Sequence, residues 1–197
     1  MINNISTYCI NLDKRTDKWE QVQKESKKLG VDLIRFPGFK ERRGHDGCRK
    51  SHLAILDQLK NEPMFMLTED DFKIIVKDPI GLVNKAVSQL PADWDMLYLG
   101  ATLTQPIERY SENLYRIKKA WATHAIIYNN QNGVVEYILQ NHNTKKFSVF
   151  LCDDVQLKFN CYITYPMVAT QRAGHSDILR HYVDYAGIEQ RYKKYAR

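Results

Sequence analysis

Two hydrophobic patterns alternate along the chain. Short continuous apolar runs bounded by turn residues predict buried strands, and apolar residues spaced three or four apart predict helices with one buried face. In chain order, the first half reads strand 7–12, helix 19–29, strand 33–36, helix 51–59, strand 64–68, helix 78–90 and strand 95–100. Strands that alternate with helices from the first residues onward predict an α/β domain with a largely parallel central sheet.

The second half of the chain is less regular. Its patterns predict strands at 114–117, 123–128, 149–152 and 162–165 and a helix at 133–139. No periodicity is present at 101–112, and an irregular connector of this length is typical of a segment that covers a site. Apolar residues near helical spacing return at 176–197 and end in basic residues. We expect one domain at 1–175 and a basic helical tail at 176–197 that packs on it.

Three adjacent carboxylates, Glu69, Asp70 and Asp71, directly follow the apolar run at 64–68. Side chains placed in this way repel one another at neutral pH, and a divalent cation with oxygen ligands relieves the repulsion. A solvated acidic turn that caps the next element explains the triplet equally well. Ligands bind at the carboxyl ends of strands in a parallel sheet, which favours the cation site.

Composition limits the class of protein. The chain has 197 residues, 44% of them hydrophobic and 26% charged, which is enough for one domain with a proper core. Its apolar runs are too short to span a bilayer and its start lacks a signal peptide, so we expect a soluble, cytoplasmic protein. The four cysteines include no CxxC pair, as in reduced intracellular proteins. The net charge of +6 fits an anionic partner: a nucleotide diphosphate, a nucleic acid or a membrane surface.

The sequence lacks the two common phosphate-binding loops. No GxGxxG follows the first strand, and neither GxxxxGKS nor GxxxxGKT occurs. A bound nucleotide would therefore need a metal ion and basic side chains to hold its diphosphate, and the loop at 40–50 is rich in Lys and Arg. Cys48 and His52 are four residues apart and could bind zinc together with His45, but no fourth ligand is evident.

Six short motifs, in this order, resemble glycosyltransferase family 25, which contains lipopolysaccharide galactosyltransferases and collagen hydroxylysine galactosyltransferases. They are CINLDKR at 9–15, GCRKSH at 47–52, LTEDD at 67–71, WDMLYLG at 94–100, THA at 123–125 and QRAGHSDI at 171–178. The resemblance implies a single GT-A type domain, a UDP-sugar donor (most often UDP-galactose), a Mn²⁺ or Mg²⁺ ion and inversion at the anomeric carbon. The implied acceptor is a glycan, a lipopolysaccharide or a hydroxylysine-type side chain. Arg49 and Lys50 depart from the family, whose members are usually apolar at this place.

The resemblance also implies roles for residues. The acidic motif of such a fold holds the metal ion, which stabilises charge on the departing nucleotide. Asp71 is then the first metal ligand, with Glu69 and His175 as further ligands, and an ordinary surface histidine is the alternative for His175. The expected nucleotide-binding residues are Asn11, Leu12, Arg15, Lys50, Ser51, His52 and Asp70, where Ser51 and His52 open a helix whose amides face an anion.

Inversion requires a carboxylate base on the acceptor side, separate from the metal ligands. The predicted strand at 149–152 runs into Asp153 and Asp154, and a parallel sheet would bring these two to the same edge as the triplet. We predict Asp154 as the base, with Asp153 second. The alternative is that Asp154 caps the following helix.

Two other functions fit part of the pattern. A metal-dependent nuclease would use Glu69, Asp70 and Asp71 together with Lys73. A module that binds a nucleotide or glycan without turnover would keep the transferase fold but catalyse no reaction. We expect no nucleic-acid partner, and the tyrosine-rich basic tail permits contact with a membrane surface without requiring it.

Overall fold

The centre of the molecule is an eight-stranded sheet, seen in a computed structural model that describes residues 2–196. The strands in spatial order are β2 (Leu33–Pro37), β1 (Thr7–Asn11), β3 (Met64–Glu69), β10 (Ala125–Asn129), β5 (Met96–Tyr98), β11 (Cys161–Thr164), β8 (Leu114–Ile117) and β7 (Glu108–Ser111). The pairings make β10 and β8 antiparallel to their neighbours, so the other six strands run in one direction. The predicted α/β fold with a largely parallel sheet is confirmed.

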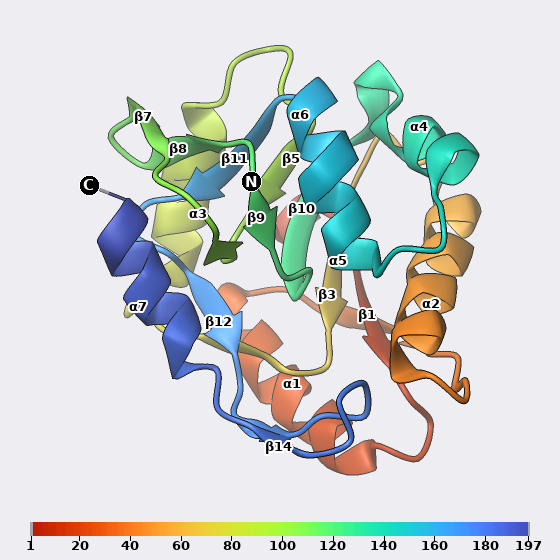
Figure 1. Ribbon diagram of the computed structural model, residues 1–197. Helices are drawn as coiled ribbons and strands as arrows, with labels where there is room; N and C mark the ends of the chain where they lie inside the picture. Colours follow the sequence, from red (N-terminus) through yellow and green to blue (C-terminus); the bar gives the residue numbers. More distant parts are fainter. Residues whose placement is uncertain (1, 197) are drawn as a thin grey trace.

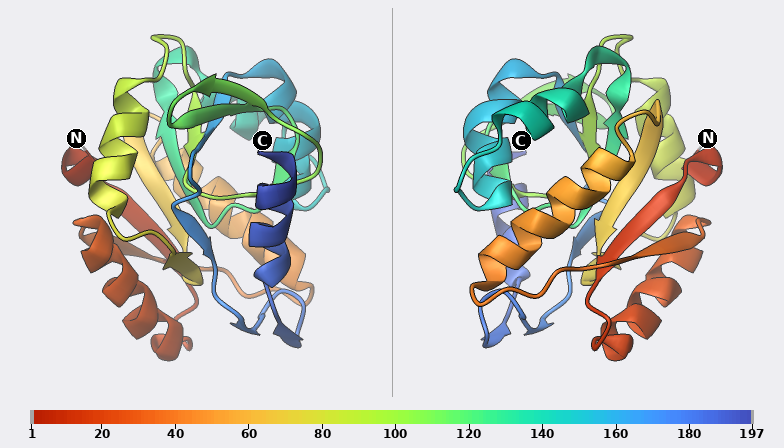
Figure 2. Two further views of the ribbon diagram at one scale, coloured as in Figure 1. Left: turned by 90° about the vertical axis from the view of Figure 1, so that its left-hand side faces the viewer. Right: turned by 90° about the vertical axis from the view of Figure 1, so that its right-hand side faces the viewer.

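Helices cover both faces of this sheet (Figure 1, Figure 2). One face carries α1 (Thr16–Leu29) and α3 (Pro79–Ser88). The opposite face carries α2 (Gly44–Gln58), α4 (Val134–Asn141), α7 (Ala186–Tyr195) and a helical segment made of α5 (Phe147–Phe150), the π-helical turn η3 (Leu151–Val155) and α6 (Gln156–Lys158). Each face has its own hydrophobic core, so the sheet is buried on both sides, as is usual for parallel strands.

The first β-α-β unit follows its sequence pattern closely. Val22, Ser26 and Leu29 form the buried side of α1. Gly30 adopts a left-handed conformation with φ 70°, and its N–H donates to the Lys27 carbonyl, which ends the helix. The chain then returns to pair β2 in parallel with β1, so the carboxyl ends of both strands lie at one edge of the sheet.

Helix α2 begins at Gly44, earlier than the predicted start at Ser51, so most of the predicted basic loop at 40–50 is helical. A Cβ atom at Gly47 would lie 2.5 Å from the Phe39 carbonyl oxygen. The Ser51 hydroxyl donates to the Gly47 carbonyl at 2.7 Å and accepts the Phe39 N–H at 2.8 Å. These contacts hold the first turns of α2 against the end of β2.

The strand predicted at 149–152 is wrong, because these residues are helical. A short apolar run has no periodicity that separates a strand from a fully buried helix, and Phe150, Leu151 and Cys152 are all buried. Asp153 and Asp154 consequently lie on a helix, where Asp153 pairs with Lys145 at 3.3 Å. Asp154 accepts a hydrogen bond from the Tyr137 hydroxyl at 2.6 Å and pairs with Lys158 at 3.0 Å.

No residue of the irregular stretch at 101–112 lines either of the two cavities described below. The stretch contains β7 and the short strand β6 (Thr102–Leu103), which pairs with β9 (Ala120–Trp121). Four other short strands form two pairs: β4 (Phe72–Ile74) pairs with β12 (Ala169–Gln171), and β13 (Gly174–His175) pairs with β14 (Tyr182–Val183). The strand β14 and helix α7 make up much of 176–197, and Ile188 and Tyr192 of α7 are buried. No helix described within 2–196 combines the length and apolar character needed to cross a bilayer.

Candidate active site

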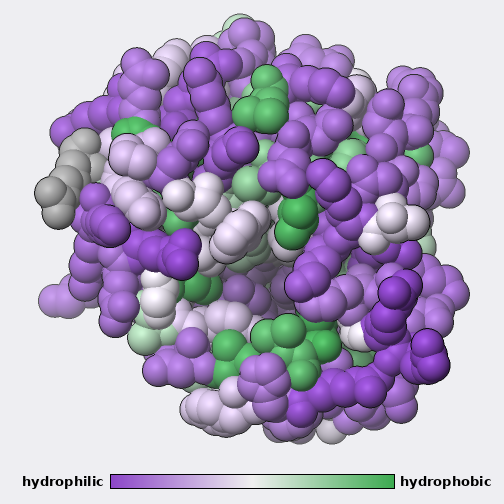
Figure 3. Space-filling view, viewed as in Figure 1, coloured by the Kyte–Doolittle hydropathy of each residue, from purple (hydrophilic) through white to green (hydrophobic). Residues whose placement is uncertain are grey.

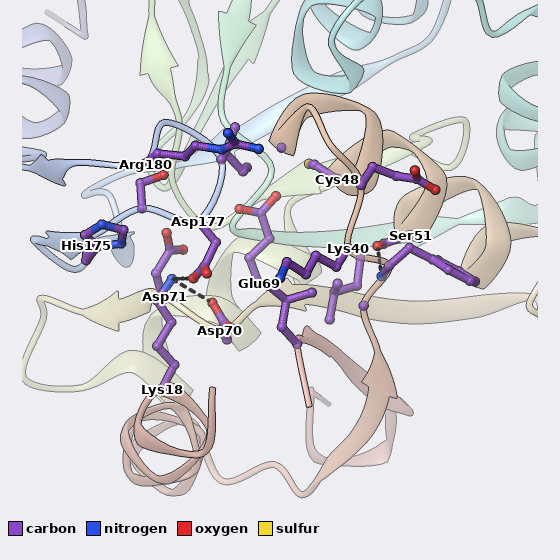
Figure 4. A pocket seen from close by; sticks show the side chains of 18 of the residues that line it. Lys18, Lys40, Cys48, Ser51, Glu69, Asp70, Asp71, His175, Asp177 and Arg180 are labelled. Carbon is purple, nitrogen blue, oxygen red and sulfur yellow. Dashed lines mark hydrogen bonds and ion pairs between the residues drawn. The ribbon is translucent and has the colours of Figure 1, made fainter. Parts of the chain in front are cut away.

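A cavity of about 410 Å³ lies at the carboxyl ends of β1, β2 and β3. Helix α2 forms one wall, and the segment 171–185, which we call the strap, forms another (Figure 4). A second cavity of about 220 Å³ adjoins it on the α1 side and shares Lys18, Asp70, Asp71, His175, Ser176 and Tyr185. The space-filling view shows a hollow near the centre of this face, with hydrophobic and hydrophilic side chains around its opening (Figure 3).

Asp70 lies between β1 and α1. One carboxylate oxygen accepts a hydrogen bond from the Asn11 amide at 2.7 Å, and the other pairs with Lys18 at 3.3 Å. Asn11 is itself oriented by Arg35, which donates to its amide oxygen at 2.6 and 2.9 Å. Burial nevertheless raises the pKa of Asp70 above its ordinary value. A cation beside this carboxylate would offset that cost.

Asp71 is the least satisfied carboxylate of the triplet. Its Oδ2 accepts from the Gln171 amide at 3.1 Å, whereas its Oδ1 is sealed from solvent and has no hydrogen-bond partner among the described residues. Burial, assisted by the charges of Glu69 and Asp70, raises the pKa of Asp71 to about 8. A buried carboxylate oxygen without a donor, next to further carboxylates, is the environment that a divalent cation satisfies.

Glu69 points the other way, toward α2, as Figure 4 shows. Its Oε1 lies 3.0 Å from His52 Nε2 and also accepts a short hydrogen bond from the Thr123 hydroxyl. Burial opposes ionisation, but these hydrogen bonds outweigh it and hold the pKa of Glu69 below its ordinary value. The triplet is therefore divided between two sides of the cavity.

A group of cations faces the strap. Asp177 of the strap pairs with Lys14 at 3.0 Å, makes a short ion pair with Arg15 and lies 4.0 Å from Lys18. Lys18 therefore stands between Asp70 and Asp177. Burial raises the pKa of Asp177, but its cationic partners prevail and keep it below the ordinary value. The strap is thus held in place by cationic side chains that would also attract an anionic ligand.

The structure brings most of the expected site residues to one place. The main cavity is lined by Leu12, Ser51, His52, Glu69, Asp70, Asp71 and His175, and Arg15 and His175 line the adjoining one. Asn11 contacts the site through Asp70. Lys50 instead pairs with Glu41 and lies over the Phe39 ring, two residues that themselves line the cavity.

The other expected residues lie elsewhere. Asp153 and Asp154 line neither of the two cavities, and they lie on a helix instead of at the end of a strand, so the strand that was expected to bring them to the edge of the triplet is absent there. A catalytic role for either residue stays a prediction. Lys73, the residue required by the nuclease hypothesis, is exposed on β4 and also lies outside both cavities.

Sequence reasoning missed several residues that line the cavities. Lys14 lies in the turn before α1 and Lys18 in the first turn of the helix, and both lie within 4.0 Å of Asp177. Nothing in their spacing distinguishes them from other surface lysines. Gln171 and Asp177 lie within a recognised motif, but nothing in their local pattern indicates that the strap folds back onto β3.

The fold is of the GT-A type. The chain is similar to the crystal structure of a glycosyltransferase involved in the glycosylation of the major capsid of PBCV-1, with a TM-score of 0.54 and 10% identity over 89% of this chain and 96% of that one. It is also similar to apo UDP-glucose pyrophosphorylase (TM-score 0.49, 11% identity, 96% of this chain and 81% of that one). A putative glucose-1-phosphate thymidylyltransferase from Bacillus anthracis gives a TM-score of 0.45 and 11% identity over 95% and 73% of the two chains.

At these identities the likeness concerns the fold, and it confirms the GT-A type predicted from the sequence. No protein-family model matches the chain, and no curated protein matches it in sequence. Membership of glycosyltransferase family 25 therefore stays a prediction.

Proposed function

We propose that the protein is a glycosyltransferase that takes a hexose, in the first place galactose, from a UDP-sugar in a reaction that depends on a divalent cation. One observation carries the proposal. Asp71 Oδ1, which has no hydrogen-bond partner among residues 2–196, is buried beside Asp70 in a cavity at the carboxyl ends of three parallel strands, on a fold similar to that of a glycosyltransferase. Nucleotide-binding α/β proteins place their ligands at this edge.

The residues present fit a divalent cation. Asp70 and Asp71 would hold Mn²⁺ or Mg²⁺, because both are hard oxygen donors and burial raises the pKa of each carboxyl, a cost that a cation would offset. When bound, such an ion stabilises negative charge on the departing nucleotide diphosphate. Lys14, Arg15 and Lys18 add positive charge on the same side of the cavity, so they would orient the diphosphate.

A mainly apolar wall on the opposite side of the cavity suits the nucleoside. Ile10, Leu12, Gly38 and Phe39 form it at the ends of β1 and β2. A Cβ atom at Gly38 would lie 3.3 Å from the Ile10 side chain, so glycine leaves this wall open to a flat ring. Such a wall next to a group of cations matches a uridine diphosphate better than a free sugar.

A panel of nucleotide sugars with Mn²⁺ tests the proposal. UDP-galactose should be hydrolysed or transferred with release of UDP, and excess chelator should abolish the reaction. Asp71→Asn should lower the rate a hundredfold or more, and the exposed Asp57→Asn should not change it.

Three results would refute the proposal. The first is equal turnover with chelator. The second is UDP binding without turnover of any UDP-sugar, which would identify a binding module. The third is formation of a UDP-sugar and pyrophosphate from UTP and a sugar 1-phosphate, which would identify a nucleotidyltransferase.

A further inference from the structure

A second group of metal-binding side chains lies apart from Asp70 and Asp71, where α2 meets the end of β3. Cys48, His52 and Glu69 each offer one ligand atom, and these atoms all lie within 4.8 Å of one another. Cys48 and His52 are one helical turn apart and share a face of α2. Figure 4 shows the Glu69 carboxylate directed toward the helix that carries Cys48 and away from Asp70 and Asp71.

The imidazole of His52 is held in one orientation. The residue is 1% exposed, and its ring is stacked on Phe147, with the ring centres 4.4 Å apart. Its Nε2 is directed at Glu69. This nitrogen is therefore the ligand atom that the ring offers to an ion beside Cys48 and Glu69.

The spacing of the donors suits a small ion. His52 Nε2 and Glu69 Oε1 are 3.0 Å apart, and two nitrogen or oxygen ligands of a tetrahedral zinc ion lie about 3.3 Å apart. Cys48 is a free cysteine. Both α2 residues are also firmly placed, since Gly47 and Ser51 fasten this part of the helix to Phe39.

We propose that Cys48, His52 and Glu69 bind a zinc ion at a site separate from the one formed by Asp70 and Asp71. A thiolate and an imidazole favour zinc over Mn²⁺ or Mg²⁺, which prefer carboxylate and water oxygens. As the zinc–sulfur bond forms, the thiol proton is released to solvent, and the hydrogen bond between His52 and Glu69 is given up. All three residues line the main cavity, so the remaining coordination position faces its interior.

This assignment replaces one ligand of the zinc hypothesis drawn from the sequence. His45 is not part of the group, and Glu69 supplies the third donor. The ion would cross-link α2 to β3 whatever reaction the protein catalyses, so the proposal does not rest on the proposed function.

Cobalt substitution tests the site directly. Protein freed of metal with a chelator is titrated with Co²⁺, which should give a thiolate-to-cobalt absorption band in the near ultraviolet that Zn²⁺ then removes. Competition against a chromophoric chelator measures the zinc affinity. Cys48→Ser should abolish the band, and both Cys48→Ser and His52→Gln should weaken zinc binding tenfold or more. Cys152→Ser, which alters another buried cysteine, should change neither.

One variant separates this site from the site formed by Asp70 and Asp71. Asp71→Asn should retain the cobalt band, which a single shared metal site would not allow. Circular dichroism of the metal-free variants establishes that each is folded. A wild-type protein without the band, a band that persists in Cys48→Ser, or unchanged zinc affinity in a folded His52→Gln variant would overturn the proposal.

Discussion

Replacing Asp71 by Asn is expected to stabilise the metal-free protein and to remove its response to a divalent cation. Burial together with Glu69 and Asp70 raises the pKa of Asp71 to about 8, from an ordinary value of 3.8. Because the folded chain holds this proton more tightly than the unfolded chain, the contribution of Asp71 to stability is fully present below about pH 4. It is lost as the pH rises through about 8.

The pKa difference sets the size of the effect. It corresponds to about 4 kcal/mol at pH 7 and to about 6 kcal/mol above pH 8. Both values are upper limits. Water that enters the site and small movements of neighbouring groups lower the energy of a buried charge. The Asn amide also places a donor where Oδ1 has no partner, at a cost of about 1–2 kcal/mol. We therefore expect Asp71→Asn to raise the free energy of unfolding by about 2 kcal/mol at pH 8 and not at pH 4.

Urea denaturation with excess chelator, at several pH values between 4 and 8, measures this difference. The exposed Asp57→Asn variant is the control and should follow the wild type. Addition of Mn²⁺ at pH 8 should then stabilise the wild type and leave Asp71→Asn unchanged, because ligand bound only to the folded state shifts the unfolding equilibrium. Parallel pH profiles for wild type and Asp71→Asn, or a variant that is less stable at pH 8, would refute the reasoning.

Three further substitutions and one matched control test the packing and the charges of the domain. Gly100→Ala should lower the free energy of unfolding by about 3 kcal/mol in thermal unfolding, because the added Cβ would overlap a carbonyl oxygen of β12. The control is Gly187→Ala in α7, where the added Cβ meets no described atom within 4 Å, so this change should be neutral or slightly stabilising. Asp177→Asn should tighten UDP binding about threefold by calorimetry, since it frees three cations, and equal affinity would count against the proposed diphosphate contacts. Glu25→Gln should cost about 2 kcal/mol at pH 7. Because the pKa of Glu25 is held below its ordinary value of 4.5, the difference from wild type should disappear as the pH falls through that lowered pKa.

The fold could be predicted where the sequence is strongly periodic. Helix α1 and the strands on either side of it follow their patterns to within a few residues, and Gly30 marks the helix end. The direction of the other strands could not be predicted in this way. A strand buried on both faces reads as a continuous apolar run whether it is parallel or antiparallel, so nothing in 125–129 indicates that β10 runs against β3.

Strand topology predicted the part of the site that follows β1 and β3, whereas Ser51, His52 and His175 were expected from the family resemblance. Asp70 and Asp71 come directly after β3, and Leu12 follows β1, so the topology of a parallel sheet was sufficient to bring them together. The strap could not be placed, since its position depends on ion pairs across more than 150 residues, such as Arg15 with Asp177. The same lack of local information allowed 149–152 to be taken for a strand.

Strand periodicity explains why carboxylates that are consecutive in the sequence lie in two different surroundings. Successive side chains of a strand face opposite sides of the sheet. Phe65 and Leu67 belong to the core shared with α2, and Met66 belongs to the core shared with α1. Continuing this alternation directs Glu69 toward α2, where it contacts His52, and Asp70 toward α1, where it contacts Lys18. Moving the triplet by one residue along β3 would exchange these partners, so the register of β3 determines which carboxylate stands beside a thiol and an imidazole and which beside lysine.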